Sequence, residues 1–172
     1  MKLARSSDFD ALFQRVYPPL FRYCHRMTGD PDQADDLAQE AFFRLWDRGI
    51  QGPEGSIRVW LFRVATNLAR DGFRARERRR HILTAHPTDD SVPGPDREME
   101  RNEEIEKARR ALGGVPDRDR EILLLRQEGF SYKEIADAVG VAPTSVGTLL
   151  ARALRRFGKA LSDEEHYDGS SR

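Results

Sequence analysis

A row of basic side chains in the middle of the chain could bind nucleic acid. Its members recur at helical spacing: Arg63, Asn67, Arg70, Arg74 and Arg78. Residues three and four apart share one face of a helix, so these side chains would form a single ridge beside Trp60, Phe62 and Thr66. Cations can follow a phosphate backbone while aromatic rings take unstacked bases, and the Asn67 amide could read a base edge. The pattern predicts a surface for single-stranded nucleic acid. The alternative is a solvated arginine face over core aromatics.

The stretch from Ser131 to Phe157 has the pattern of a helix-turn-helix. Ile135, Val146 and Leu150 recur where two helices would pack across a tight turn. Gly140 can supply the left-handed conformation that such a turn needs. The second helix of this motif normally enters the major groove of DNA. A plain helical hairpin in another kind of bundle is the alternative for this segment alone.

The second helix of this motif carries side chains suited to duplex DNA. Small and hydroxylated residues precede arginines on its outward side, which allows close approach to bases with positive charge near phosphates. Ser131 and Lys133 begin the preceding helix, whose N-terminus could hold a phosphate. The candidate duplex contacts are Ser131, Lys133, Thr144, Thr148, Ala151, Arg152 and Arg155. For Arg155, Arg156 and Lys159, a solvated helix end stabilised by the helix dipole explains the charges equally well.

A third surface is expected on the helix over residues 34–47. Its apolar stripe consists of Ala34, Leu37, Ala38, Ala41, Phe42 and Leu45. The opposite side carries Asp36, Gln39, Glu40, Phe43 and Asp47, with Trp46 beside them. An exposed aromatic among acids and an amide is typical of a protein contact. Taken alone, however, the helix is better explained by an ordinary polar face with one aromatic.

The elements that must position these residues are all expected to be helices. Periodicity, caps and Gly or Pro breaks predict helices over 6–27, 31–47, 57–80, 96–112, 116–129, 131–139 and 143–160. Pro18 and Pro19 lie inside the first pattern, where proline could kink a helix. Residues 84–97 hold little to bury and predict a flexible linker. We therefore expect an all-α fold of two small helical domains, residues 1–83 and 98–162, followed by an acidic tail over 163–172.

Composition and charge exclude several classes of protein. Net charge is zero over 172 residues, but basic residues dominate 51–83 and acids dominate 84–104, which fits two separate anion-binding surfaces. Cys24 is the only cysteine, which favours a reducing, cytoplasmic setting. No signal-peptide pattern and no apolar run of bilayer length occurs. The four histidines and Cys24 lack metal-site spacing, and no nucleophile elbow or phosphate-binding glycine loop occurs. We expect no enzyme, with no catalytic residue, metal or cofactor.

Three segments in this order resemble the extracytoplasmic-function (ECF) sigma factors of the sigma-70 family. They are Asp36–Phe42, Trp60–Asp71 and the helix-turn-helix, and the resemblance extends over residues 9–160. It implies sigma region 2, a helical domain, in the N-terminal half and region 4 in the C-terminal half. Such a protein binds core RNA polymerase, recognises the −35 duplex of a promoter, and melts and reads the −10 element.

The resemblance also implies a role for each candidate surface. Contacts to the β′ clamp helices of core polymerase would come from Asp36, Gln39, Glu40, Phe43 and Trp46. Contacts to −10 DNA would come from Trp60, Arg63, Asn67, Arg70, Arg74 and Arg78, and contacts to −35 DNA from the duplex-contacting residues named above. Region 4 would also meet the polymerase β flap, and the linker would occupy the RNA exit path. An anti-sigma factor is a further implied partner. We expect a cytoplasmic protein that is monomeric when free and does not insert into membranes.

Two departures from the family pattern matter. Leu149 stands where the family commonly has arginine and Gly147 where it often has a basic residue, so we expect a −35 contact to be missing. The loop Ile50–Pro53 lacks the usual aromatic followed by Arg-Gly, which changes the pocket for a flipped −10 base. A stand-alone helix-turn-helix regulator is the alternative function. It would need a dimer surface and DNA half-sites, and it gives the N-terminal motifs no role.

Overall fold

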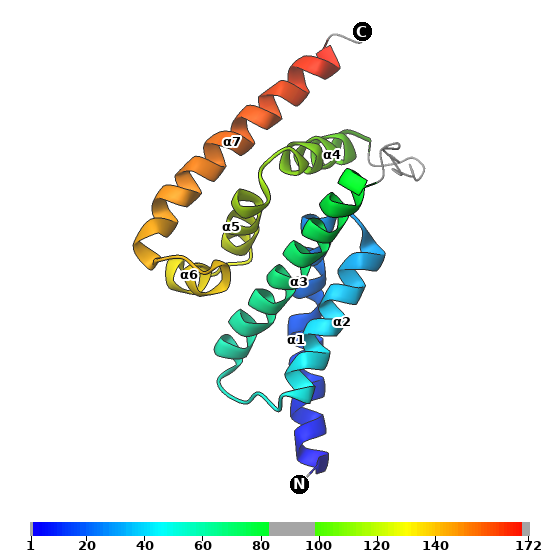
Figure 1. Ribbon diagram of the computed structural model, residues 1–172, viewed down its shortest axis with the longest axis vertical. Helices are drawn as coiled ribbons and strands as arrows, with labels where there is room; N and C mark the ends of the chain where they lie inside the picture. The colour runs from blue at the N-terminus through cyan, green and yellow to red at the C-terminus, as the bar shows by residue number, and fades with distance from the viewer. Residues whose placement is uncertain (1, 83–98, 170–172) are drawn as a thin grey trace.

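The fold is built from helices. The computed structural model describes residues 2–82 and 99–169, and no strand occurs within these ranges (Figure 1). The helices described are α1 (Lys2–Thr28), α2 (Pro31–Asp47), α3 (Glu54–Ile82), α4 (Met99–Gly113), α5 (Asp117–Gln127), α6 (Tyr132–Val139) and α7 (Pro143–Gly169). The all-α prediction is confirmed, whereas the linker predicted over 84–97 lies outside the described residues. None of these helices is both long enough and apolar enough to cross a membrane.

Helices α1, α2 and α3 form an N-terminal bundle, and local sequence signals define its first turn. Gly29 adopts the left-handed conformation, with φ 72°. Asp30 caps α2, because its side chain accepts hydrogen bonds from the backbone N–H groups of Asp32 at 2.9 Å and Gln33 at 3.2 Å. The predicted apolar stripe of α2 is buried except for Leu37, which is half-buried.

Helix α1 continues through Pro18 and Pro19. Proline inside a helix removes a backbone hydrogen bond and clashes with the preceding turn. Val16, Leu20 and Tyr23 lie on either side of the two prolines and are all buried. Burial of this apolar side against α2 and α3 therefore holds α1 together where its backbone hydrogen bonding is weakest.

Helices α4 to α7 form a C-terminal bundle that contains the predicted helix-turn-helix. Ser131 and Glu134 cap α6 reciprocally: the Ser131 hydroxyl accepts from the Glu134 N–H at 3.3 Å, and the Glu134 carboxylate accepts from the Ser131 N–H at 2.7 Å. Gly140 ends α6 in the left-handed conformation, with φ 71°. Helix α7 runs beyond residue 160, where the sequence predicted its end, and an ion pair of 2.6 Å between Arg110 and Glu164 holds it to α4. The predicted acidic tail therefore begins inside α7.

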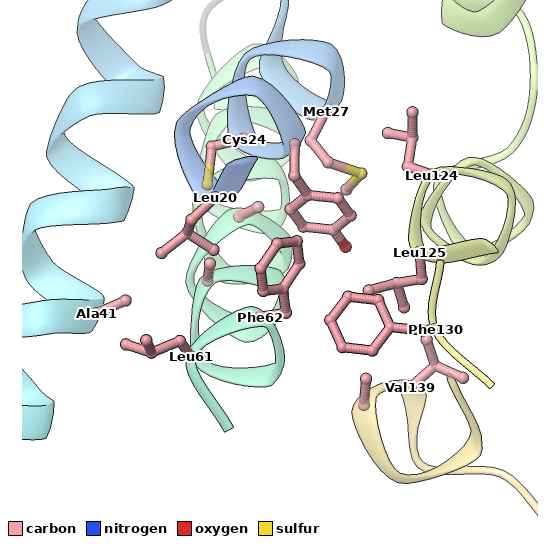
Figure 2. Packing of buried hydrophobic residues seen from close by; sticks show 14 of the residues in the cluster. Leu20, Cys24, Met27, Ala41, Leu61, Phe62, Leu124, Leu125, Phe130 and Val139 are labelled. Atoms are coloured by element: carbon pink, nitrogen blue, oxygen red, sulfur yellow. The ribbon is translucent and has the colours of Figure 1, made fainter. Parts of the chain in front are cut away.

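The two bundles pack against each other through α3 with α6 and α1 with α5. The rings of Phe62 and Phe130 meet edge to face with centroids 4.8 Å apart, and both side chains are buried. Figure 2 shows Leu125 and Val139 beside Phe130, on the side of this contact that belongs to the C-terminal bundle. Buried side chains from both bundles make one continuous hydrophobic cluster. The sequence predicted two bundles but did not predict this contact between them.

Candidate nucleic-acid and protein interfaces

The predicted basic ridge lies on α3, and four of its five members are exposed: Arg63, Asn67, Arg74 and Arg78. Within the described residues, none of these four side chains has an ion pair or a side-chain hydrogen bond. Like charges one helical turn apart repel each other. A row of arginines without acidic partners is therefore better suited to an external anion than to stabilising the helix.

Arg70, the fifth member of the ridge, is bound within the protein. Its guanidinium donates two hydrogen bonds to the Glu121 carboxylate of α5, Nε to Oε1 at 2.7 Å and Nη2 to Oε2. Glu121 is fully buried, and the hydrogen bonds to its carboxylate raise the pKa of Arg70 above the usual value. A buried carboxylate without a partner is strongly destabilising. In this conformation Arg70 therefore stabilises the packing of the bundles rather than adding to an open surface.

Two residues expected beside the ridge are buried rather than exposed. Phe62 and Thr66 have no exposed area, and the Thr66 hydroxyl lies 2.7 Å from the Tyr23 hydroxyl. Thr66 also donates to the Phe62 carbonyl at 2.7 Å. The expectation that they flank an open ridge is wrong for this conformation, because the Phe62 ring packs against Tyr23 of α1 and against Phe130, and Thr66 faces Tyr23.

A pocket of about 400 Å³ lies between the start of α3 and α6. Trp60 and Arg63 line it from α3, and Lys133, Glu134 and Asp137 line it from α6. Trp60 and Arg63 are candidates for binding single strands, and Lys133 is a candidate for binding duplex DNA. The structure thus brings members of two predicted DNA surfaces to one place.

Most of the residues predicted to contact duplex DNA from the start of α7 are exposed. Thr144, Thr148, Ala151 and Arg155 are exposed. Arg152 is half-buried, and its Nη2 donates to Asp119 of α5 at 2.9 Å. The structure therefore presents a small, hydroxylated surface near the turn, with Arg155 as its outermost charge.

Asp119 is a buried carboxylate that holds two turns of α7 to α5. Its Oδ1 accepts from Arg152 and its Oδ2 accepts from Arg156 at 2.5 Å. Burial alone would raise the pKa of Asp119, but the hydrogen bonds from the two arginines outweigh burial and lower it. Asp119 thus fixes the direction of the Arg152 side chain and the position of this part of α7.

Replacing Asp119 with Asn should lower the free energy of unfolding by about 1–2 kcal/mol at neutral pH. The neutral amide loses the charge-assisted hydrogen bonds to the two arginines, while both guanidinium groups can bind water instead. A carboxyl group whose pKa is lower in the folded than in the unfolded protein stabilises the fold at pH values above its unfolded-state pKa. This stabilisation is lost as the pH falls through the folded-state pKa. The stability difference between wild type and Asp119→Asn should therefore shrink below about pH 4. Urea melts at several pH values measure it, and a constant difference across that range would contradict the assignment.

The N-terminus of α6 is less suited to phosphate than the sequence suggested. The Ser131 hydroxyl and backbone N–H are both used in the cap with Glu134. The Ser131 backbone N–H, with its hydroxyl, lowers the pKa of Glu134, which favours a negative charge at this helix start. An incoming phosphate would meet that carboxylate, so exposed Lys133 is the remaining basic group there.

The third predicted surface forms an exposed apolar and acidic patch on α2. Asp36 and Gln39 are exposed, and Phe43 and Trp46 expose 63% and 56% of their area. The Trp46 ring also packs edge-on against Phe9 at 5.0 Å. Glu40 is half-buried and pairs with Arg44 at 2.7 Å. Two large exposed aromatics one turn apart are unusual on a solvated helix and indicate a protein contact. We call Asp36, Gln39, Phe43 and Trp46 the α2 patch.

A second pocket, of about 970 Å³, adjoins the α2 patch at the end of α2. Phe9 and Trp46 line it together with Gln51 and Gly52 of the loop before α3. An ion pair of 2.8 Å between Arg15 and Glu54 ties α1 to the start of α3 beside it. The loop Ile50–Pro53, which departs from the family pattern, therefore borders this pocket.

No metal-binding cluster is present in the described part of the chain, where no three His, Cys, Asp or Glu side chains come together. Cys24 is buried, and burial raises the pKa of its thiol to about 12. A thiol of this kind stays protonated near neutral pH and is a poor nucleophile or ligand. The sequence-based interpretation of Cys24 as a core residue is confirmed.

Comparison with known families gives matches to both halves. The sequence model described as Sigma-70 region 2 matches residues 12–79, and the one described as Sigma-70, region 4 matches residues 105–157. The chain is 34% identical over 159 residues to the ECF RNA polymerase sigma factor EcfG of Rhodopseudomonas palustris, covering 89% of this chain and 82% of that protein. It is 32% identical over 180 residues to the ECF RNA polymerase sigma factor SigG of Mycobacterium tuberculosis, covering 87% of this chain but 47% of SigG, so it spans about half the length of that relative.

Solved structures of similar fold include two protein complexes. The sigma factor RpoE in complex with the anti-sigma factor NepR from Bartonella quintana matches with a TM-score of 0.74 and 23% identity, over 90% of this chain and 97% of that chain. CnrH in complex with the cytosolic domain of CnrY matches with a TM-score of 0.68 and 22% identity, over 92% and 90%. At these identities the likeness shows the fold.

Proposed function

The chain belongs to the ECF sigma factors of the sigma-70 family, and from this premise we propose that it directs core RNA polymerase to a set of promoters. Core polymerase would carry out RNA synthesis, while this chain would choose the sequence and help to separate the strands, with no covalent step of its own. One observation carries the proposal: four exposed ridge residues on α3, Arg63, Asn67, Arg74 and Arg78, which have no ion pair among the described residues, occur in the same chain as an exposed polar face at the start of α7.

The ridge on α3 is proposed to bind the separated −10 strand. Arg63, Arg74 and Arg78 would neutralise phosphates, and each contact would release counterions and make binding depend on salt. Asn67 would contact a base edge, and Trp60 would provide an aromatic surface at one end. Binding of unpaired strands would offset the cost of unpairing, which is a few kcal/mol.

The start of α7 is proposed to read the −35 duplex. Thr144, Thr148 and Ala151 are exposed and small enough for the backbone to approach base edges. Arg155, Arg152 and, from α6, Lys133 would reach phosphates. Ser131 would contribute least, because its polar groups already serve the cap of α6. Since Gly147 and Leu149 replace basic residues of the family pattern, we expect −35 recognition to be weak.

The α2 patch, with Glu40, is proposed to bind the clamp helices of the polymerase β′ subunit, and the region 4 domain the β flap. We propose domain limits of 1–83 and 98–162, which enclose both family matches. A protein of the anti-sigma class is a further proposed partner, because a sigma factor of similar fold is in a complex with an anti-sigma factor. The chain would act in the cytoplasm, where core polymerase acts.

Run-off transcription with purified core polymerase on a promoter library tests this function. We expect discrete RNA start sites that appear only when the chain is added. Failure to associate with core, or association without any RNA start, would overturn the proposal. Gel filtration and pulldown with core address the alternative, since a stand-alone helix-turn-helix regulator would elute as a dimer and would not bind core.

A further inference from the structure

The start of α7 presents methyl and hydroxyl groups rather than charges. Thr144, Thr148 and Ala151 are exposed and recur at positions i, i+4 and i+7, so they share one side of the helix. Gly147 adjoins them, one turn before Ala151, and residues 143–151 contain no charged side chain and no side-chain amide. In a helix that enters the major groove, the N-terminal residues are the ones that contact base edges. The surface that meets the bases would therefore be uncharged.

The ring of Tyr132 extends this surface from α6. Tyr132 exposes 48% of its area, and a Cβ atom placed on Gly147 would lie 3.6 Å from its Cε2 atom. That distance is an ordinary van der Waals contact, so the ring lies directly beside the position that has no side chain. Arg126 of α5 lies 5.9 Å from the ring centroid, within the range of a cation–π contact. Tyr132 therefore places an exposed aromatic edge next to the start of α7.

The arginines of α7 are poorly placed to contact guanine. Bidentate pairing with guanine O6 and N7 needs two available N–H groups on one guanidinium. In Arg152, Nη2 donates to Asp119 at 2.9 Å, and Nε is buried without a partner among the described residues. Asp119 also accepts from Arg156 at 2.5 Å. Arg155 is exposed but lies about 17 Å along the helix axis from Thr144, where the DNA backbone is the nearer partner.

We propose that the start of α7 selects T·A base pairs through their thymine methyl groups and does not select guanine. The methyl groups of alanine and threonine, and aromatic rings, are apolar partners of the thymine methyl group in the major groove. Asp119 is a positioning residue in this scheme, because it holds Arg152 towards α5 and away from the base edges. The inference rests on the proposed function and names the class of −35 sequence that the chain binds.

Selection from a duplex library randomised over the −35 element measures this preference. The full chain is combined with core polymerase, and bound templates are separated by gel retention and sequenced, so RNA synthesis is not needed. We expect thymine to be enriched in the element. Replacing the selected thymines with deoxyuridine, which lacks the methyl group, should weaken binding about fourfold for each methyl group contacted. The same replacement in the spacer should have no effect. Unchanged binding, no enrichment, or an element that requires guanine overturns the proposal.

Two variants test the residues separately, with thermal melts to confirm that they fold. Thr148→Ser removes one methyl group and keeps the hydroxyl, so it should lose about fourfold on thymine DNA and nothing on deoxyuridine DNA. Asp119→Asn releases Arg152 and should select guanine at one further position, with a preference of roughly tenfold. A merely structural role would weaken binding to all sequences alike and would overturn the assignment of Asp119. Asp117→Asn is the matched control, since this exposed acid of α5 pairs with Arg120, and it should keep the wild-type preference.

Run-off transcription on the selected templates separates this inference from the proposed function. Templates whose thymines are required for binding, but which start no RNA, would remove the proposed function and support the base preference. RNA starts that require guanine in the −35 element would support the proposed function and overturn the base preference.

Discussion

Replacing both Asn67 and Arg74 with alanine is expected to lower run-off transcription about a hundredfold while leaving affinity for core polymerase unchanged. A base contact and a phosphate or stacking contact are each worth about 1–3 kcal/mol, and a loss of about 3 kcal/mol corresponds to roughly a hundredfold. Both side chains are exposed and have no partner among the described residues, so their removal should not destabilise α3. Open-complex formation, measured by reactivity of unpaired thymines, should fall in parallel with transcription.

Asp71→Ala is the matched control for this variant, because Asp71 is exposed on α3 between the two positions but carries the opposite charge. It should leave open-complex formation equal to wild type or slightly improved. Arg74→Ala alone should also reduce the salt dependence of the DNA-binding constant by the amount that corresponds to about one phosphate contact. Normal strand opening by the Asn67 and Arg74 double variant would show that the ridge has another role.

Local signals in the sequence were sufficient to predict most of the helices. The Asp30 cap, the Ser131 and Glu134 cap and the left-handed Gly140 all depend on residues within a few positions of each other. The period of buried residues in α2 likewise follows from helix geometry. Pro18 and Pro19 show the limit of this reasoning, since α1 is held through them by packing against α2 and α3, which no local pattern reports.

The contact between the bundles could not be predicted in the same way. Arg70 belongs to the ridge by spacing, and only the position of α5 in space gives it a partner. Asp119 and Glu121 were not singled out because acids are rarely buried. A weak signal existed for Glu121, which precedes the buried Leu124 and Leu125 by three and four positions and so shares their side of α5.

The second large effect is expected for the α2 patch. Replacing Asp36 and Phe43 together with alanine should weaken binding to core polymerase about a hundredfold, because a central aromatic at a protein interface is commonly worth about 2 kcal/mol or more and an acidic partner adds to it. Phe43 is the better choice than Trp46, whose ring packs on Phe9 and therefore also stabilises the fold. Asp32→Ala, at an exposed position one turn earlier on α2, is the matched control and should bind core normally.

The dependence of transcription on concentration separates a defect in core binding from a defect in promoter opening. If Asp36 and Phe43 contact core, their double variant should regain transcription when the chain is added at about a hundredfold higher concentration, because mass action restores the complex. The Asn67 and Arg74 double variant should stay defective at any concentration, because its complex with core forms but cannot hold separated strands. Equal rescue of both variants would mean that α2 and α3 contribute to one surface, and the assignment of separate partners to the two helices would then be wrong.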